Sequence, residues 1–331
     1  MKKIMYTLAL TSAMFLTACG GNDAPQPQQP AGNEQAQAPE HNHNHAHNDT
    51  DYNGIINVVT TFSILEDMVL QVGGELVNVY NIVPRGEEPE DHEVLPSNLM
   101  AVANSDVIFY NGMNLETAGY WFEDLLEATD RLNHHSVVRA TQGIQSLFLQ
   151  TEGLEDYEDP HAWLDLSLAT VYVQNIADTL SNIAPQHADT FDANAEAFIA
   201  QLLTLHYQWI HAFDNIPDER RLLVTAEGAF RYFSLAYGLN VAYIWELNAE
   251  EEGTPEQMIR IIEIVNASDV PYLFTESSIE PYYIEQVSQE TGVPIFGMLF
   301  TDSLDEEGEP AGTFYGMMRH NLETIYMALS L

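Results

Sequence analysis

Lysine and cysteine are almost absent from this chain. Lys2 and Lys3 are the only lysines in 331 residues, and Cys19 is the only cysteine. A single cysteine excludes an intramolecular disulfide and a cysteine-rich metal site. Ten Lys plus Arg stand against 50 Asp plus Glu, so the formal net charge is −40. Such a surface repels nucleic acid and anionic lipid headgroups and attracts cations, although adaptation to a salty or alkaline medium also produces it.

Motifs of common enzymes are also absent. The chain has no HExxH, no GxSxG and no Walker-type glycine loop, which mark zinc proteases, serine hydrolases and nucleotide-binding enzymes. A metallohydrolase would further need an open coordination position and a general base, and the sequence identifies neither. We therefore expect a binding protein and not an enzyme.

The first 18 residues point to export. Lys2 and Lys3 precede the apolar segment 4–16, which is too short to span a bilayer comfortably. The next residues, Leu-Thr-Ala-Cys-Gly at 16–20, resemble a bacterial lipobox, in which the cysteine is lipidated. We expect residues 1–18 to be a lipoprotein signal peptide. Cys19 would then carry a lipid anchor on the outer, extracytoplasmic face of the cell membrane.

Residues 19–53 are predicted to form a disordered tether. After Cys19 the segment is rich in Gln, Pro, Asn, Gly and Ala and lacks periodicity. Neutral imidazoles on a flexible chain can collect transition metals, so a histidine tract here is an auxiliary metal-collecting candidate, with a merely polar linker as the alternative. Its histidines are His41, His43, His45 and His47.

Segment 185–215 shows the clearest periodicity in the chain. Its apolar side chains recur at steps of three and four residues, which places them on one face of a helix. They are Phe191, Ala195, Phe198, Leu202, Leu205, Trp209 and Phe213. At about 1.5 Å per residue the helix would be roughly 45 Å long, more than one small domain needs. We predict a rigid helix that joins two lobes, with His187, His206 and His211 at its surface.

Strands and helices are predicted to alternate on both sides of this helix. In lobe 54–184 we expect strands at 56–61, 77–83, 107–110 and 136–140, and helices at 63–72, 96–103, 120–128 and 166–183. In lobe 216–331 we expect strands at 222–225, 241–245, 272–275 and 294–300, and helices at 230–237, 255–266, 282–291 and 312–331. This alternation is typical of parallel sheets covered on both faces. The expected fold is α/β, with two lobes joined by the long helix.

Polar side chains near the ends of the predicted strands are the candidate ligands, because open α/β sheets bind ligands beyond the carboxyl ends of their strands. In the first lobe they are Glu90, Asp91, His92, Glu93, Asp159 and His161. In the second lobe they are Glu227, Glu276 and Asp302. Histidine together with carboxylates is a ligand set for a hard or borderline divalent metal ion.

Longer motifs surround these residues. They are VIFYNGMNLET at 107–117, DPHAWL at 159–164, VTAEGAFRYF at 224–233, YIWE at 243–246, EEGTPEQ at 251–257 and FTDS at 300–303. Together they resemble the metal-binding lipoproteins of bacterial ABC importers, especially the manganese-binding branch that includes the pneumococcal surface adhesin. The resemblance covers nearly everything after residue 55. It implies two Rossmann-like lobes, a linking helix and a metal ion in the cleft between the lobes.

The resemblance implies three metal ligands and leaves the first one open. His161, Glu227 and Asp302 match the family's second, third and fourth ligands. At the position of the first ligand, the family usually has a Pro-His pair, with an aromatic residue two positions after the histidine. Here Glu90 stands in the place of the histidine and His92 in that of the aromatic residue. Residues two apart in an extended loop project to the same side, so both remain candidates. We favour His92 because imidazole is the usual donor, with Glu90 as the alternative.

The residue type at position 227 bears on the choice of metal. The resemblance implies glutamate here in the manganese branch and histidine in zinc-binding relatives, and carboxylate oxygen suits Mn²⁺ better than Zn²⁺. The histidine tract of the tether points instead to zinc or nickel. We expect a monomer that captures Mn²⁺, with Zn²⁺ as the alternative, and delivers it to an ABC permease in the membrane. A surface adhesin with a structural metal is the rival interpretation from a different class.

Overall fold

The computed structural model describes residues 54–116, 120–247 and 252–331. The predicted signal peptide, the lipidation candidate Cys19 and the four histidines of the tether lie outside these ranges. Within the described ranges, no helix is both long enough and apolar enough to cross a membrane.

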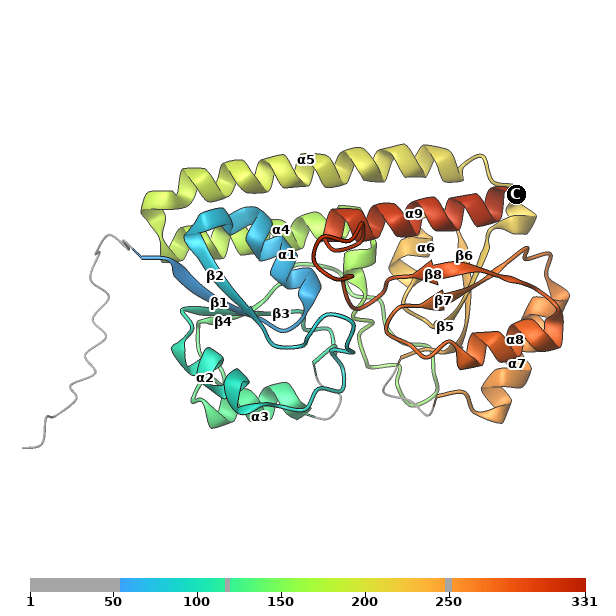
Figure 1. Ribbon diagram of the computed structural model, residues 1–331, viewed down its shortest axis with the longest axis horizontal. Coiled ribbons are helices and arrows are strands. Elements are labelled where there is room, and N and C mark those ends of the chain that lie inside the picture. Colours follow the sequence, from blue (N-terminus) through green and yellow to red (C-terminus); the bar gives the residue numbers. More distant parts are fainter. Residues whose placement is uncertain (1–53, 117–119, 248–251) are drawn as a thin grey trace, which may run out of the picture. The chain divides into compact units, whose positions relative to one another are not determined.

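The first lobe is built on one parallel sheet of four strands (Figure 1). The strands are β1 (Ile56–Thr60), β2 (Val77–Asn81), β3 (Val107–Tyr110) and β4 (Val137–Arg139), and they lie in the order β2-β1-β3-β4. In the central strand β1, Val58 pairs with Val79 of β2 and with Val107 of β3. The helices of this lobe are α1 (Ser63–Gly73), α2 (Pro96–Asn104), α3 (Trp121–Ala128) and α4 (Leu166–Ile183).

Successive strand residues face opposite sides of this sheet, and both sides are apolar. Val58 and Phe109 pack into a core that includes residues of α1 and α4. Val59 and Ile108, their neighbours along the chain, pack into a second core with residues of α2 and α3. Strands buried on both faces explain the continuous apolar runs in the sequence.

The second lobe contains two pairs of parallel strands. β5 (Leu222–Glu227) pairs with β6 (Asn240–Trp245), and β7 (Leu273–Glu276) pairs with β8 (Ile295–Leu299). The Glu276 side chain joins the two pairs, because it accepts hydrogen bonds from the backbone N–H groups of Ala226 and Glu227. The helices of this lobe are α6 (Arg231–Tyr237), α7 (Pro255–Ala267), α8 (Tyr282–Thr291) and α9 (Phe314–Ser330).

Helix α5 (Ala188–Phe213) runs past both lobes without a break (Figure 1). It contacts α1 and α4 of the first lobe and α6 and α9 of the second. All seven apolar side chains of the predicted face are buried, which confirms the periodicity. One expectation is wrong: His206 is buried, because it lies beside this face and its Nδ1 is 3.2 Å from the hydroxyl of Tyr237.

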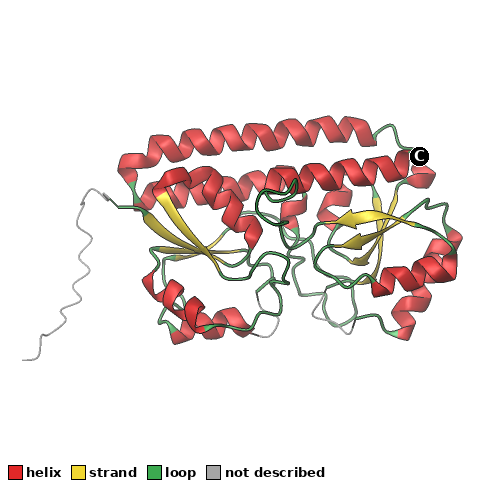
Figure 2. Ribbon diagram, viewed as in Figure 1, coloured by secondary structure: helices red, strands yellow, loops and turns green. Residues whose placement is uncertain are grey.

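A single apolar core continues along α5 from one lobe into the other. It includes Val69 of α1, Leu180 of α4, Leu202 of α5, Phe233 of α6 and Leu322 of α9. Figure 2 shows that loops occupy the region between the strands of the two lobes. The two lobes are therefore joined firmly along α5, while irregular chain supplies the groups that meet between the sheets.

Candidate metal centre

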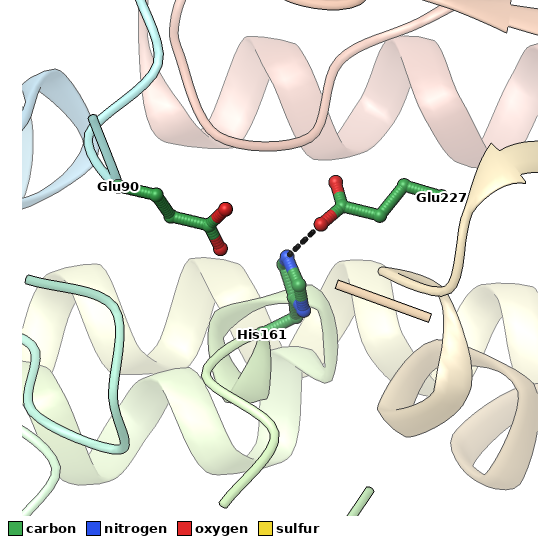
Figure 3. A group of neighbouring side chains, drawn as sticks. All are labelled: Glu90, His161 and Glu227. Carbon is green, nitrogen blue, oxygen red and sulfur yellow. Dashed lines mark ion pairs between the residues drawn. The ribbon is translucent and has the colours of Figure 1, made fainter. Parts of the chain in front are cut away.

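Glu90, His161 and Glu227 converge from three distant parts of the chain (Figure 3). Each offers one ligand atom, and these atoms all lie within 4.8 Å of one another. Glu90 comes from the loop between β2 and α2, His161 precedes the 3₁₀ turn Ala162–Leu164, and Glu227 ends β5. All three residues are at most 2% exposed. Side chains of both lobes therefore meet at one buried point.

Asp302, which follows β8, approaches the same imidazole. Its Oδ1 lies 3.3 Å from His161 Nε2, and Glu227 Oε1 lies 4.0 Å from that nitrogen. Asp302 is 1% exposed, and neither of its carboxylate oxygens has a hydrogen-bond partner among the described residues. One nitrogen of His161 therefore faces two carboxylates of the second lobe.

The ring of His92 lies elsewhere. It packs edge-on against Trp121, with ring centroids 5.3 Å apart, and its Nε2 is 3.4 Å from Asn98 Oδ1. The expectation that residues two apart share one side required an extended loop, but the chain bends at residues 89–91. The structure thus groups Glu90 with the other candidates and places His92 against an aromatic side chain.

Asp159 orients the imidazole of His161. Its Oδ1 lies 2.9 Å from His161 Nδ1 and accepts a hydrogen bond from the His161 backbone N–H at 3.1 Å. A proton held on Nδ1 by a carboxylate leaves Nε2 as the donor atom for a metal, which is the usual arrangement around metal-binding histidines. Asp159 was a sequence candidate, and the structure gives it this supporting position.

The group carries more negative than positive charge in a buried place. Burial raises the pKa of the Glu227 carboxyl well above its ordinary value, and the nearby charges of Glu90 and Asp302 raise it further. Burial alone would lower the pKa of His161, but its hydrogen bond with Asp159 and the nearby carboxylates of Asp302 and Glu227 raise it well above the ordinary value. Carboxylates that repel one another in this way are stabilised by a bound cation.

Two more buried carboxyl groups adjoin these residues. Glu276 holds the end of β5 through its two hydrogen bonds, and burial raises its pKa to about 8. Burial, followed by the charge of Asp302, raises the pKa of Glu88 to about 9. Glu88 was missed from the sequence, where only its closeness to Glu90 singles it out among 50 acidic residues.

An acidic cavity adjoins Glu90. Its volume is about 380 Å³, and its lining includes Glu88, Glu90, Asp91, Glu252 and Glu280. Side chains of both lobes contribute to it, because the first three precede α2 and the last two belong to the second lobe. Among the described residues, the ionisable side chains that line this cavity are carboxyl groups and one tyrosine, so the cavity favours cations.

Comparison with known proteins places the chain among metal-binding transport proteins. Residues 58–328 match the family described as zinc-uptake complex component A, periplasmic. The chain is 41% identical over 276 residues to the metal ABC transporter substrate-binding lipoprotein ScbA of Streptococcus cristatus, a match that covers 83% of this chain and 89% of that protein. It is 40% identical, with the same shares covered, to the manganese ABC transporter substrate-binding lipoprotein PsaA of Streptococcus pneumoniae.

A solved structure has a similar fold. The periplasmic zinc binding protein TroA from Treponema pallidum aligns with a TM-score of 0.75 and 30% identity, over 82% of this chain and 98% of that one. The family match spans most of the chain, and the relatives match nearly to their full length. The chain therefore belongs to the family of zinc-uptake complex component A.

Proposed function

We propose that this protein is the extracytoplasmic substrate-binding component of an ABC importer, which captures Mn²⁺ and passes it to a permease. The buried group of one imidazole and three carboxylates, drawn from both lobes, carries the proposal. Such a group is costly without a cation, because buried like charges repel one another. The names of the relatives ScbA and PsaA favour transport over other uses of a metal site.

The proposed ligands are Glu90, His161, Glu227 and Asp302. Glu90 replaces our earlier preference for His92, because the ring of His92 is packed against Trp121 while Glu90 lies within the group. The resulting set contains three carboxylates and one imidazole. Carboxylate oxygens are ligands that Mn²⁺ prefers, whereas a set richer in imidazole suits Zn²⁺ better.

Zn²⁺ is the second candidate substrate. It is favoured by the description of the family and by TroA, which is named for zinc. Most sites of nitrogen and oxygen ligands bind Zn²⁺ more tightly than Mn²⁺ in a test tube, so affinity alone does not identify the transported ion. Elemental analysis of cells that lack the protein separates the two: we expect loss of manganese with zinc unchanged, and loss of zinc alone would favour the second candidate.

Capture and release need no covalent chemistry. Glu90 and His161 belong to segments before α5, and Glu227 and Asp302 to segments after it. We propose lobes that extend over 54–184 and 216–331, with 185–215 as the link, so that a small separation of the lobes divides the ligands. The shared core along α5 favours a restrained motion, because a packed core resists gradual deformation.

The ligand set is tested by calorimetry on metal-free protein. Asp302→Ala and Glu90→Ala should each weaken Mn²⁺ binding by at least about 100-fold, since changes in groups behind metal ligands alone cost 10–100-fold. His92→Ala is the matched control and should change the affinity by less than about threefold, because its ring lies outside the group. If His92→Ala and not Glu90→Ala abolished binding, the ligand assignment would be reversed.

The N-terminal segment is proposed to attach the protein to the membrane and to supply metal ions to the site. We propose that Cys19 is lipidated after removal of residues 1–18 and that His41, His43, His45 and His47 collect metal for the site. Cys19→Ser should release the protein from the membrane fraction into the medium. A tether in which all four histidines are replaced should leave the affinity of the folded site unchanged and slow metal capture only when metal is scarce.

A further inference from the structure

Arg231, the first residue of α6, reaches across from the second lobe to Asp159 in the first. Its Nη1 lies 3.3 Å from Asp159 Oδ2, while the other oxygen of Asp159 contacts the imidazole of His161. Arg231 is 9% exposed, and the carboxylate that it approaches is 1% exposed. Water therefore screens this ion pair weakly.

The same guanidinium is held by a second buried carboxylate. Glu246 Oε1 lies 3.1 Å from Arg231 Nη1, and the side chain of Glu246 is 2% exposed. Arg231 Nη2 also donates a hydrogen bond to the backbone oxygen of Phe148 at 2.7 Å. One positive charge thus stands between two negative ones, with a loop of the first lobe bound to its other nitrogen.

Glu246, in the second lobe, also binds the loop of the first lobe that follows Phe148. It accepts hydrogen bonds from the backbone N–H groups of Gln150 and Thr151 at 2.7 Å each, and from the Thr151 hydroxyl at 2.9 Å. Tyr232, the neighbour of Arg231, places its hydroxyl 3.1 Å from the backbone oxygen of Asp159. Residues 148–151 and Asp159 are therefore bound to the second lobe by charged or hydrogen-bonded contacts.

We infer that Arg231 is a positioning residue for His161. Arg231 acts through Asp159 and so makes the orientation of the His161 ligand depend on the contact between the lobes. The inference deepens the proposed function and rests on it. When the lobes are together, Arg231 fixes the Asp159 carboxylate, and that carboxylate fixes the imidazole with Nε2 towards the site. When the lobes separate, Asp159 loses its cation and His161 loses its fixed partner, so the same movement that divides the ligands also loosens one of them.

Arg231 connects residues that are distant in the sequence. Asp159 lies 72 residues before it and Glu246 lies 15 residues after it, so only the fold reveals the connection. By linkage, a contact that strengthens metal binding must itself be strengthened by the metal. The bound metal should therefore tighten the loop 148–151, although this loop contributes no ligand to the group.

Titration of metal-free protein with Mn²⁺ tests the inference. Arg231→Met should weaken binding 10–100-fold, as expected for a group behind a metal ligand, and Arg231→Lys should recover part of the loss because it restores the charge. Arg260→Met is the matched control: Arg260 also belongs to the second lobe and donates to a backbone oxygen, that of Ile244, without an ion pair to the first lobe among the described residues. It should bind within about twofold of the unmodified protein.

A double-mutant cycle distinguishes positioning from a structural role. If Arg231 acts through Asp159, then adding Arg231→Met to a protein that already carries Asp159→Asn should weaken Mn²⁺ binding by less than about a further twofold. If Arg231→Met alone does not fold, it can be combined with Glu246→Gln, which removes both charges of that ion pair together. This double variant should show the same 10–100-fold loss of Mn²⁺ affinity that is expected for Arg231→Met. In the unmodified protein Mn²⁺ should slow hydrogen exchange at the amides of Gln150 and Thr151, and this protection should disappear in Arg231→Met.

Four outcomes decide the matter. Unchanged Mn²⁺ affinity in Arg231→Met, or losses from Arg231→Met and Asp159→Asn that multiply independently, would overturn the inference and leave the proposed function standing. A lower melting temperature with unchanged affinity would also overturn it, because that is the signature of a purely structural contact. Failure of the unmodified protein to bind Mn²⁺ at all would overturn the proposed function and the inference together.

Discussion

Protonation of the ligand groups governs how the site responds to pH. Burial lowers the pKa of His161, but the hydrogen bond with Asp159 and the nearby carboxylate of Asp302 outweigh this and raise it well above the ordinary value. Burial and the charges of Glu90 and Asp302 raise the pKa of Glu227. A metal binds only the deprotonated forms, so Mn²⁺ must displace protons that the metal-free site holds at neutral pH.

Binding of Mn²⁺ should therefore release at least one proton near pH 7. The apparent affinity should rise with pH, by about tenfold per pH unit for each proton released. Calorimetry in buffers of different ionisation enthalpy measures the number of protons directly. His92→Ala should show the same proton release, because His92 is not in the group. Identical heats in all buffers would show that the site is already deprotonated.

The sequence identifies three of the four grouped residues by their places at strand ends and motifs, but it does not separate Glu90 from His92. Both residues lie in one loop, and the choice depends on how that loop bends at 89–91. Bends in irregular chain depend on tertiary contacts, here including the hydrogen bond from Trp121 Nε1 to the backbone oxygen of Pro89. No local pattern in the sequence carries that information. Arg231 and Glu246 lie within quoted motifs, but their ion pairs also depend on tertiary contacts that no local pattern reveals.

At the scale of elements, strand and helix bounds were predictable to within three residues. The strands are short apolar runs with clear breaks, and the helices have strong boundary signals. Thr254, for example, begins α7 with a capping box in which its side chain accepts from the N–H of Gln257 and its own N–H donates to the Gln257 side chain. The order of strands within the sheets was not predictable, because pairing is decided by packing between distant segments.

The continuity of helix α5 should limit how far the two lobes separate, and a substitution in the helix tests this. Gln201 lies near its middle and is exposed, so a substitution there alters the helix without disturbing the buried face. Proline at this position removes a backbone hydrogen bond and kinks the helix at a cost of about 3 kcal/mol or more. We expect Gln201→Pro to lower the unfolding free energy by that amount and to accelerate Mn²⁺ release to a chelator in stopped-flow measurements.

Gln201→Ala is the control for this prediction, because alanine keeps the helix intact and removes only the side chain. It should leave both the release rate and the stability nearly unchanged. A folded Gln201→Pro protein that released Mn²⁺ at the unmodified rate would show that the continuity of α5 does not limit the motion of the lobes. The shared core, which also passes through α1 and α9, would then be sufficient by itself.

At the scale of the whole molecule, the net charge of −40 acts in two opposite directions. It attracts Mn²⁺ and raises the rate at which the ion meets the acidic cavity beside Glu90. It also drives the negative surface groups apart, which destabilises the compact state. Salt weakens both effects, because the Debye length falls from about 30 Å at 0.01 M ionic strength to about 3 Å at 1 M.

Raising NaCl from 0.01 to 1 M should therefore slow Mn²⁺ association while it stabilises the metal-free fold. We expect the association rate to fall by at least about tenfold, in line with the 10–10³-fold gain that electrostatic steering provides. The thermal midpoint of the metal-free protein should rise over the same range, whereas an uncharged osmolyte such as sucrose should stabilise the fold and slow association only through its viscosity. Stopped-flow kinetics and thermal melts measure the two quantities. If the midpoint rose while the association rate stayed constant, the charge would serve the protein's tolerance of its medium, and attraction of the ion would be confined to the carboxylates at the site.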